Sequence, residues 1–99
     1  MLNINKSADN GILTFTLEGR LDTTTAPQLE EEIKGSVAGI TELYFDVNSL
    51  EYISSAGLRV LLAAQKIMNK QGKMVVKNVS EEVNEILEVT GFSDILTIE

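Results

Sequence analysis

The chain has 99 residues and a formal net charge of −7, and 43% of its residues are hydrophobic, which predicts one globular domain spanning residues 1–99. The acidic charge argues against a nucleic-acid partner, and the absence of cysteine excludes disulfides and thiolate metal sites. No apolar stretch has the length of a signal peptide core or a membrane span, so we expect a cytoplasmic protein that does not insert into a membrane.

The first predicted element is a β-hairpin. Leu2 and Ile4 alternate with polar residues, and a clean alternation of apolar and polar residues resumes over residues 13–17. Between them lies Asn10-Gly11, a pair in which both residues tolerate positive φ. The chain is therefore expected to open with two antiparallel strands.

A first helix is predicted soon after this hairpin. Thr25 and Gln28 have the spacing of a capping box, and Pro27 suits the first helical turn. Gly35 or Gly39 is expected to end the helix.

The remaining elements alternate between strand and helix. We expect strands over 43–47 and 73–77, a helix over about 55–71, a third helix capped by Ser80 and stopped at Gly91, and a short strand over 95–98. The predicted fold class is α/β: a mixed, mostly parallel sheet of four to five strands, opened by a β-hairpin and covered by about three to four helices.

The 55–71 helix has a wider apolar arc than a surface helix needs, because Leu58 and Leu62 extend the side formed by Val60, Ala64 and Met68. Either the third helix covers the excess, or part of this helix is an exposed docking face. The five basic residues from Arg59 to Lys77, which no acid interrupts, are either a solvated helix face or a contact surface for an acidic partner.

The residue types in the sequence provide little support for a catalytic function. The chain has no histidine or cysteine, and the carboxylates of Asp22, Asp46 and Glu51 show no spacing that identifies an acid/base pair. No glycine-rich phosphate-binding motif is present. We therefore expect a binding protein rather than an enzyme, with no metal and no cofactor.

The most informative stretch runs from Leu50 to Leu62, where small polar residues open directly into an apolar helix. Either Ser54 or Ser55 can cap that helix. Gly57 in a first helical turn costs about 1 kcal/mol relative to alanine, which indicates that the sheet or a partner approaches the backbone closely there.

Residues 50–59, Leu-Glu-Tyr-Ile-Ser-Ser-Ala-Gly-Leu-Arg, resemble the signature loop of STAS domains, in particular the bacterial anti-sigma-factor antagonists. The resemblance continues along the chain, through residues 19–26, 43–47, 72–76 and 91–96. It implies a STAS-type sheet and a regulatory protein that binds an anti-sigma factor and thereby frees a sigma factor.

The resemblance also implies a phosphorylation switch. In such antagonists the anti-sigma factor is commonly a serine kinase, phosphorylation of a serine at the start of the second helix releases the complex, and a serine phosphatase resets it. The acceptor maps onto Ser55, two residues before Gly57. Many phosphorylated members have Asp-Ser where this chain has Ser54-Ser55, which makes Ser54 the alternative acceptor.

A partner-binding surface is expected around this serine. The loop after the second strand should lie beside the start of the second helix, because both follow strand carboxyl ends. The predicted surface comprises Asp22, Thr23, Thr24, Ser54, Ser55, Ala56, Gly57, Leu58 and Arg59. Leu58 is its candidate apolar anchor and Arg59 a charge at its rim, while a plain turn before a helix is the ordinary interpretation of Asp22 and Thr23.

Two other functions remain open at this point. The chain is alternatively a STAS scaffold subunit of a transporter or signalling complex, without a phosphate cycle. A third possibility is direct nucleotide binding or weak catalysis. The oligomeric state does not follow from the sequence, although a monomer is favoured.

Overall fold

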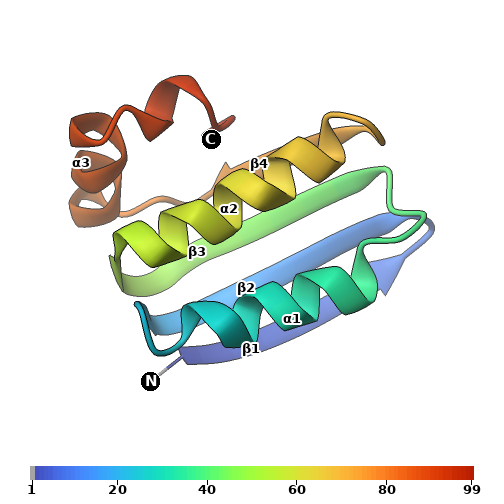
Figure 1. Cartoon of the computed structure of the whole chain (residues 1–99), viewed down its shortest axis with the longest axis horizontal. Coiled ribbons are helices and arrows are strands. Elements are labelled where there is room, and N and C mark those ends of the chain that lie inside the picture. The colour runs from blue at the N-terminus through green and yellow to red at the C-terminus, as the bar shows by residue number, and fades with distance from the viewer. Residues whose placement is uncertain (1) are drawn as a thin grey trace.

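The computed structural model describes residues 2–99. Its strands and helices follow the predicted order, with three α-helices and a short 3₁₀ helix in this part of the chain (Figure 1). The elements are β1 (Leu2–Asp9), β2 (Ile12–Leu21), α1 (Ala26–Ser36), β3 (Glu42–Ile53), α2 (Ser55–Met68), β4 (Lys73–Lys77), α3 (Glu81–Val89) and η1 (Phe92–Asp94).

The four strands form one mixed sheet in the order β1-β2-β3-β4. The hairpin is confirmed: β1 pairs antiparallel with β2, and the turn residues Asn10 and Gly11 have φ values of 49° and 81°. The other two pairings, β2 with β3 and β3 with β4, are parallel. The predicted fold class is therefore correct.

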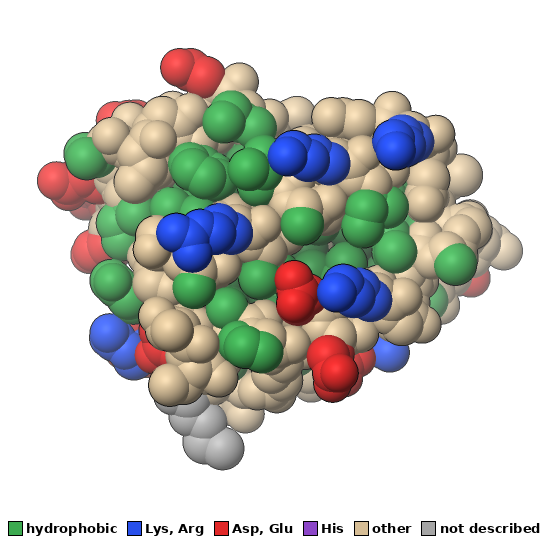
Figure 2. Space-filling view, viewed as in Figure 1, with side chains coloured by type: hydrophobic (Ala, Val, Ile, Leu, Met, Phe, Trp, Pro, Cys, Tyr) green, Lys and Arg blue, Asp and Glu red, His purple; other side chains and the backbone are tan. Residues whose placement is uncertain are grey.

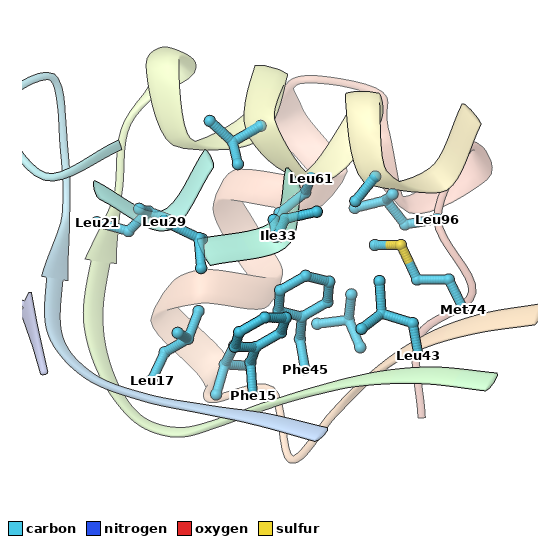
Figure 3. Packing of buried hydrophobic residues seen from close by; sticks show 14 of the residues in the cluster. Phe15, Leu17, Leu21, Leu29, Ile33, Leu43, Phe45, Leu61, Met74 and Leu96 are labelled. Atoms are coloured by element: carbon cyan, nitrogen blue, oxygen red, sulfur yellow. The ribbon is translucent and has the colours of Figure 1, made fainter. Parts of the chain in front are cut away.

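The helices lie on one face of the sheet, and the core fills the space between them (Figures 1 and 3). Alternate residues of β2 and β3 point into this space, among them Phe15 and Phe45, which stack with ring centroids 5.5 Å apart. Leu29 and Ile33 of α1 and Leu61 of α2 close the core from the helix side.

Strand β3 is longer than predicted. It continues past Val47 to Ile53, and its register against β2 shifts between Thr16 and Glu18 and again between Gly19 and Arg20. Each shift inserts an extra β3 residue, as a β-bulge does, so the alternation that marks residues 43–47 is lost in the second half of the strand. This extension carries the chain directly to the start of α2.

Three predicted boundaries are wrong. Helix α1 ends at Ser36, so Gly35 lies inside it, and Gly39 (φ 78°) follows in the loop. Helix α2 ends at Met68 rather than near residue 71. The expected last strand reduces to one bridge between Ile98 and Val76, preceded by the 3₁₀ helix.

The basic residues between Arg59 and Lys77 do not form one surface. Basic side chains are spaced along α2 on the helix face of the molecule (Figure 2). In contrast, Lys73 and Lys77 of β4 flank the Tyr44 ring on the opposite face of the sheet, with their Nζ atoms 5.7 and 5.4 Å from the ring centroid. The five residues together therefore cannot form a single contact surface for an acidic partner.

Candidate functional site

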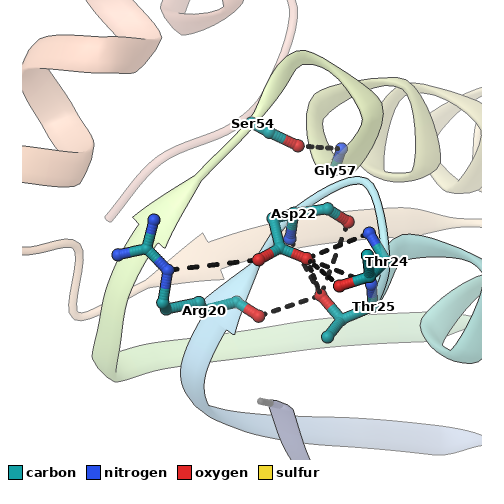
Figure 4. A network of polar contacts seen from close by, with 6 residues as sticks. All are labelled: Arg20, Asp22, Thr24, Thr25, Ser54 and Gly57. Carbon is teal, nitrogen blue, oxygen red and sulfur yellow. Dashed lines mark hydrogen bonds and ion pairs between the residues drawn. The ribbon is translucent and has the colours of Figure 1, made fainter.

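The carboxyl ends of β2 and β3 meet at one edge of the sheet, where Leu21 pairs with Ile53. The amide of Ser54 donates to the carbonyl of Leu21 at 2.8 Å and joins the loop after β2 to the start of α2. The predicted proximity of the loop after β2 and the start of α2 is therefore confirmed, and Figure 4 shows Asp22 and Thr24 near Ser54.

The carboxylate of Asp22 holds the loop after β2 in a tight turn (Figure 4). Its Oδ1 accepts from the Thr24 hydroxyl at 2.8 Å and from the amides of Thr24 and Thr25 at 3.0 and 3.2 Å. The Thr24 hydroxyl is the main reason that the pKa of Asp22 is lowered; burial opposes it, and the two amides add to the lowering. The turn interpretation of Asp22 is thus correct, and its carboxylate is already engaged.

The predicted capping box of Thr25 and Gln28 is wrong. The Thr25 hydroxyl turns away from the helix: it donates to the carbonyl of Arg20 at 2.9 Å and accepts from the amide of Asp22 at 2.8 Å. Because Thr25 is nearly fully buried, these bonds to the end of β2 satisfy its hydroxyl better than a solvent-side cap would.

Ser54 and Ser55 have different roles. Ser54 is the N-cap of α2, and its hydroxyl accepts from the amide of Gly57 at 3.3 Å. Ser55 is the first residue of the helix and is exposed, and within residues 2–99 its side chain makes no hydrogen bond. The structure therefore leaves one serine hydroxyl free at the start of α2.

Gly57 allows the start of α2 to approach the sheet. A Cβ atom built at this position would lie 2.6 Å from Cγ of Leu21 and 3.0 Å from Cγ1 of Ile53, closer than side-chain atoms pack. Of the two interpretations of this glycine, close approach of the sheet is the correct one. The contact fixes the position of the serine pair relative to β2 and β3.

The prediction of Leu58 as an apolar anchor is wrong. Leu58 is only 2% exposed, because it points from α2 into the core. Gly57 is also buried, so neither residue offers a surface to a partner, whereas Arg59 is exposed and Ala56 half-buried. No large apolar side chain of α2 is among the exposed ones in residues 2–99, and Leu62 and Ile67 are half-buried, so this helix has no large exposed apolar face.

A shallow groove runs beside the serine pair, with a volume of about 220 Å³. It lies between the first turns of α1 and α2 and is lined by Thr23, Ala26, Pro27, Glu30, Ala56, Arg59 and Val60. The residues that α1 contributes to this groove were not among those predicted from the sequence. Two helices that follow neighbouring parallel strands begin side by side, and that rule could have added Pro27 and Glu30.

A larger hollow, of about 300 Å³, lies on α3 and is lined by Glu82, Glu85, Ile86, Val89 and Thr90. It contains none of the predicted site residues. Among residues 2–99, no three acidic side chains gather as a metal site, and no helix has the length and apolar character needed to cross a membrane.

Comparisons with known proteins agree on one family. The model of the STAS domain matches residues 3–99. BtrV of Bordetella bronchiseptica, designated an anti-sigma factor antagonist, is 37% identical over 91 residues, covering 90% of this chain and 78% of BtrV. The anti-sigma-B factor antagonist of Staphylococcus aureus is 26% identical over 99 residues, covering 98% of this chain and 92% of that protein.

Solved structures share the fold. The anti-sigma factor antagonist from Mycobacterium paratuberculosis superposes with a TM-score of 0.89 at 23% identity, covering 99% of this chain and 85% of that one. The Bacillus cell fate determinant SpoIIAA in its phosphorylated form superposes with a TM-score of 0.77 at 15% identity, covering 98% and 91%.

Proposed function

This chain belongs to the STAS domain family, and we propose that it acts as an anti-sigma-factor antagonist controlled by phosphorylation of Ser55. As a single domain, the unmodified protein binds an anti-sigma factor and so frees a sigma factor. The anti-sigma factor is a serine kinase: it transfers the γ-phosphoryl group of ATP to Oγ of Ser55, which loses its proton, and ADP leaves. A phosphatase hydrolyses the phosphoester. This role implies a cytoplasmic protein and needs no catalysis by the chain itself.

The observation that carries this proposal is the difference between the two serines. Ser54 is half-buried and committed to capping α2, whereas Ser55 is exposed and its hydroxyl is free. A kinase must bring its ATP to an accessible hydroxyl, and removing Ser54 from its cap would disturb the helix. We therefore favour Ser55 over Ser54 as the acceptor.

The surroundings of Ser55 favour a switch that leaves the fold unchanged. A phosphate adds about −1.5 to −2 charges and three acceptor oxygens, and a helix N-terminus tolerates such a charge. The buried residues that follow in α2, Gly57 and Leu58, lie against the sheet and in the core, whereas Ser55 is exposed. The new charge would instead lie inside the partner interface, where desolvation and repulsion weaken binding.

The proposed partner surface consists of exposed and half-buried groups only. The turn residues Asp22, Thr23 and Thr24 form one side of it, and Ser55, Ala56 and Arg59 form the other. The class of partner rests on the relatives, because BtrV and the Staphylococcus aureus protein are both named for antagonism of anti-sigma factors.

The test begins with the partner. The Ser55→Ala variant, which cannot be released by phosphorylation, is used to capture candidate anti-sigma factors from the source cells, and the complex is then rebuilt from purified proteins. With ATP, wild type should gain one phosphate at Ser55 by mass spectrometry and lose the partner, whereas Ser55→Ala should stay bound.

Charge at the same position provides a matched comparison. Ser55→Asp should weaken partner binding, while Ser7→Asp should not, since Ser7 is exposed on β1 about 23 Å along the sheet from the site. A Ser55→Asp protein that binds as tightly as wild type would overturn the proposal. Phosphate found only on Ser54 would move the acceptor, and a complex unaffected by ATP would favour the unmodified scaffold subunit.

A further inference from the structure

Arg59 lies one helical turn after Ser55, so the two residues share a face of α2. Both are exposed. Side chains four residues apart on a helix have Cβ atoms about 6 Å apart, within reach of an arginine. The position of Arg59 therefore suits contact with a group attached to Oγ of Ser55.

The guanidinium of Arg59 is not engaged by an acid. Arg59 takes part in none of the ion pairs with an N–O distance of 4.0 Å or less within residues 2–99. These pairs join Lys6 to Glu32, Arg20 to Asp22, Lys34 to Glu30 and Lys73 to Glu42. Glu30 of α1 lines the same groove as Arg59 but pairs with Lys34 at 3.9 Å. Asp22, in the turn after β2, accepts from Thr24 and Thr25 and pairs with Arg20 at 4.0 Å.

We infer that Arg59 is the second component of the switch: it binds the phosphate on Ser55 in the modified protein and is free for an acidic partner group in the unmodified one. This inference rests on the proposed phosphorylation of Ser55. Arginine presents a planar fork of donors that matches the oxygens of a phosphate, and a charge-assisted pair of this kind is stronger than a neutral hydrogen bond.

The consequence is that one phosphate changes two features of the surface. It adds negative charge at Ser55 and it neutralises the positive charge of Arg59, one helical turn away. A partner that uses a carboxylate against Arg59 then meets a surface of opposite sign. One small group can in this way release a partner without moving a strand or helix.

The experiment uses the full chain with phosphoserine incorporated at position 55 during synthesis, so it needs no kinase. The second pKa of the phosphate is measured by ³¹P NMR titration in this protein and in its Arg59→Met variant. The arginine should hold that pKa about 0.2–0.5 units lower than the methionine variant, the size expected for an exposed ion pair. The charged groups of the neighbouring elements are present in both proteins: Glu30, which lines the groove with Arg59, and Asp22 of the turn after β2 with its ion-pair partner Arg20.

Lys66→Met is the matched control. It removes the same charge from an exposed position of α2 that lies about 16 Å along the helix axis from Ser55, beyond a Debye length. The phosphate pKa of Lys66→Met should equal that of the phosphoserine protein with both basic residues intact. Arg59→Lys should retain part of the lowering of the phosphate pKa, because the positive charge remains. An unchanged pKa in Arg59→Met, or an equal rise in Lys66→Met, overturns the inference.

The two proposals fail in different ways. If no kinase modifies Ser55 in the rebuilt complex, the proposed function fails whatever the titration shows. If the kinase modifies Ser55 but the titration finds no effect of Arg59, only the role of Arg59 fails.

Discussion

Gly57→Ala is the substitution that tests most directly how the site is held in place. The added Cβ would meet Cγ of Leu21 at 2.6 Å and Cδ2 of the same side chain at 3.0 Å. Leu21 is fully buried and has no solvent-filled space to move into. Since the backbone of Gly57 is helical, a poor backbone conformation plays no part, and steric overlap is the only unfavourable effect of the added Cβ.

Two effects of opposite sign determine the result. Alanine is the better helix former by about 1 kcal/mol, whereas overpacking a close-packed core costs about 1–3 kcal/mol. Because the overlap is with a branch carbon rather than a flexible chain end, we place the cost near the upper value. The variant should therefore be less stable than wild type by about 1–2 kcal/mol, or about 4–10 °C in Tm for a domain of this size.

Gly35→Ala provides the matched control. Gly35 also lies in a helix, α1, but a Cβ there would meet no atom within 4 Å. It should gain stability, by up to about 1 kcal/mol, through helix propensity alone. Urea unfolding followed by circular dichroism measures both, with equal m-values required for the comparison. The close-approach argument is refuted if Gly57→Ala is as stable as Gly35→Ala.

Three further predictions follow from the site. Ser54→Ala should lose about 0.5–2 kcal/mol of stability through the missing cap, whereas Ser55→Ala should change little; equal effects in thermal unfolding would mean that the roles are misassigned. Leu58→Ala should cost about 2–5 kcal/mol in urea unfolding, and a variant of normal stability would contradict its place in the core. The pKa of Asp22 is lowered on folding, so its carboxylate stabilises the protein above the ordinary value of 3.8 and that contribution is lost as the pH falls through the folded value. Asp22→Asn should accordingly be less stable than wild type at pH 7, and the difference should shrink as the pH falls below 3.8; a difference that stays constant with pH would contradict the role of the charged carboxylate in the turn.

The parts of the fold that the sequence predicts are those governed by local rules. The alternation over Leu13–Leu17 and the positive φ of Asn10-Gly11 each need only neighbouring residues to be understood, and both are confirmed. The Ser80 cap is confirmed for the same reason, since its hydroxyl accepts from Val83 at 3.3 Å.

The errors arise where tertiary contacts compete with local ones. Thr25 has the spacing of a cap, but burial beside the end of β2 gives its hydroxyl a backbone carbonyl of that strand as partner. On a helical wheel Leu58 lies outside the apolar stripe that a surface helix needs to bury. The wheel cannot show that α2 begins so close to the sheet that its first turn is buried on more than one side. Neither outcome is visible in the spacing of residues.

The net charge of the chain cannot by itself account for the proposed release. A phosphate would add about −2 to a chain that already carries −7, but exposed charges further away than about 8 Å are largely screened at physiological salt. Most of the acidic residues therefore contribute little to the change that a partner experiences. The groups that matter are those beside Ser55, namely the turn of Asp22 and the guanidinium of Arg59. Because an aspartate supplies one charge and two oxygens, Ser55→Asp should engage Arg59 less fully than phosphoserine does, and its release of the partner should be partial.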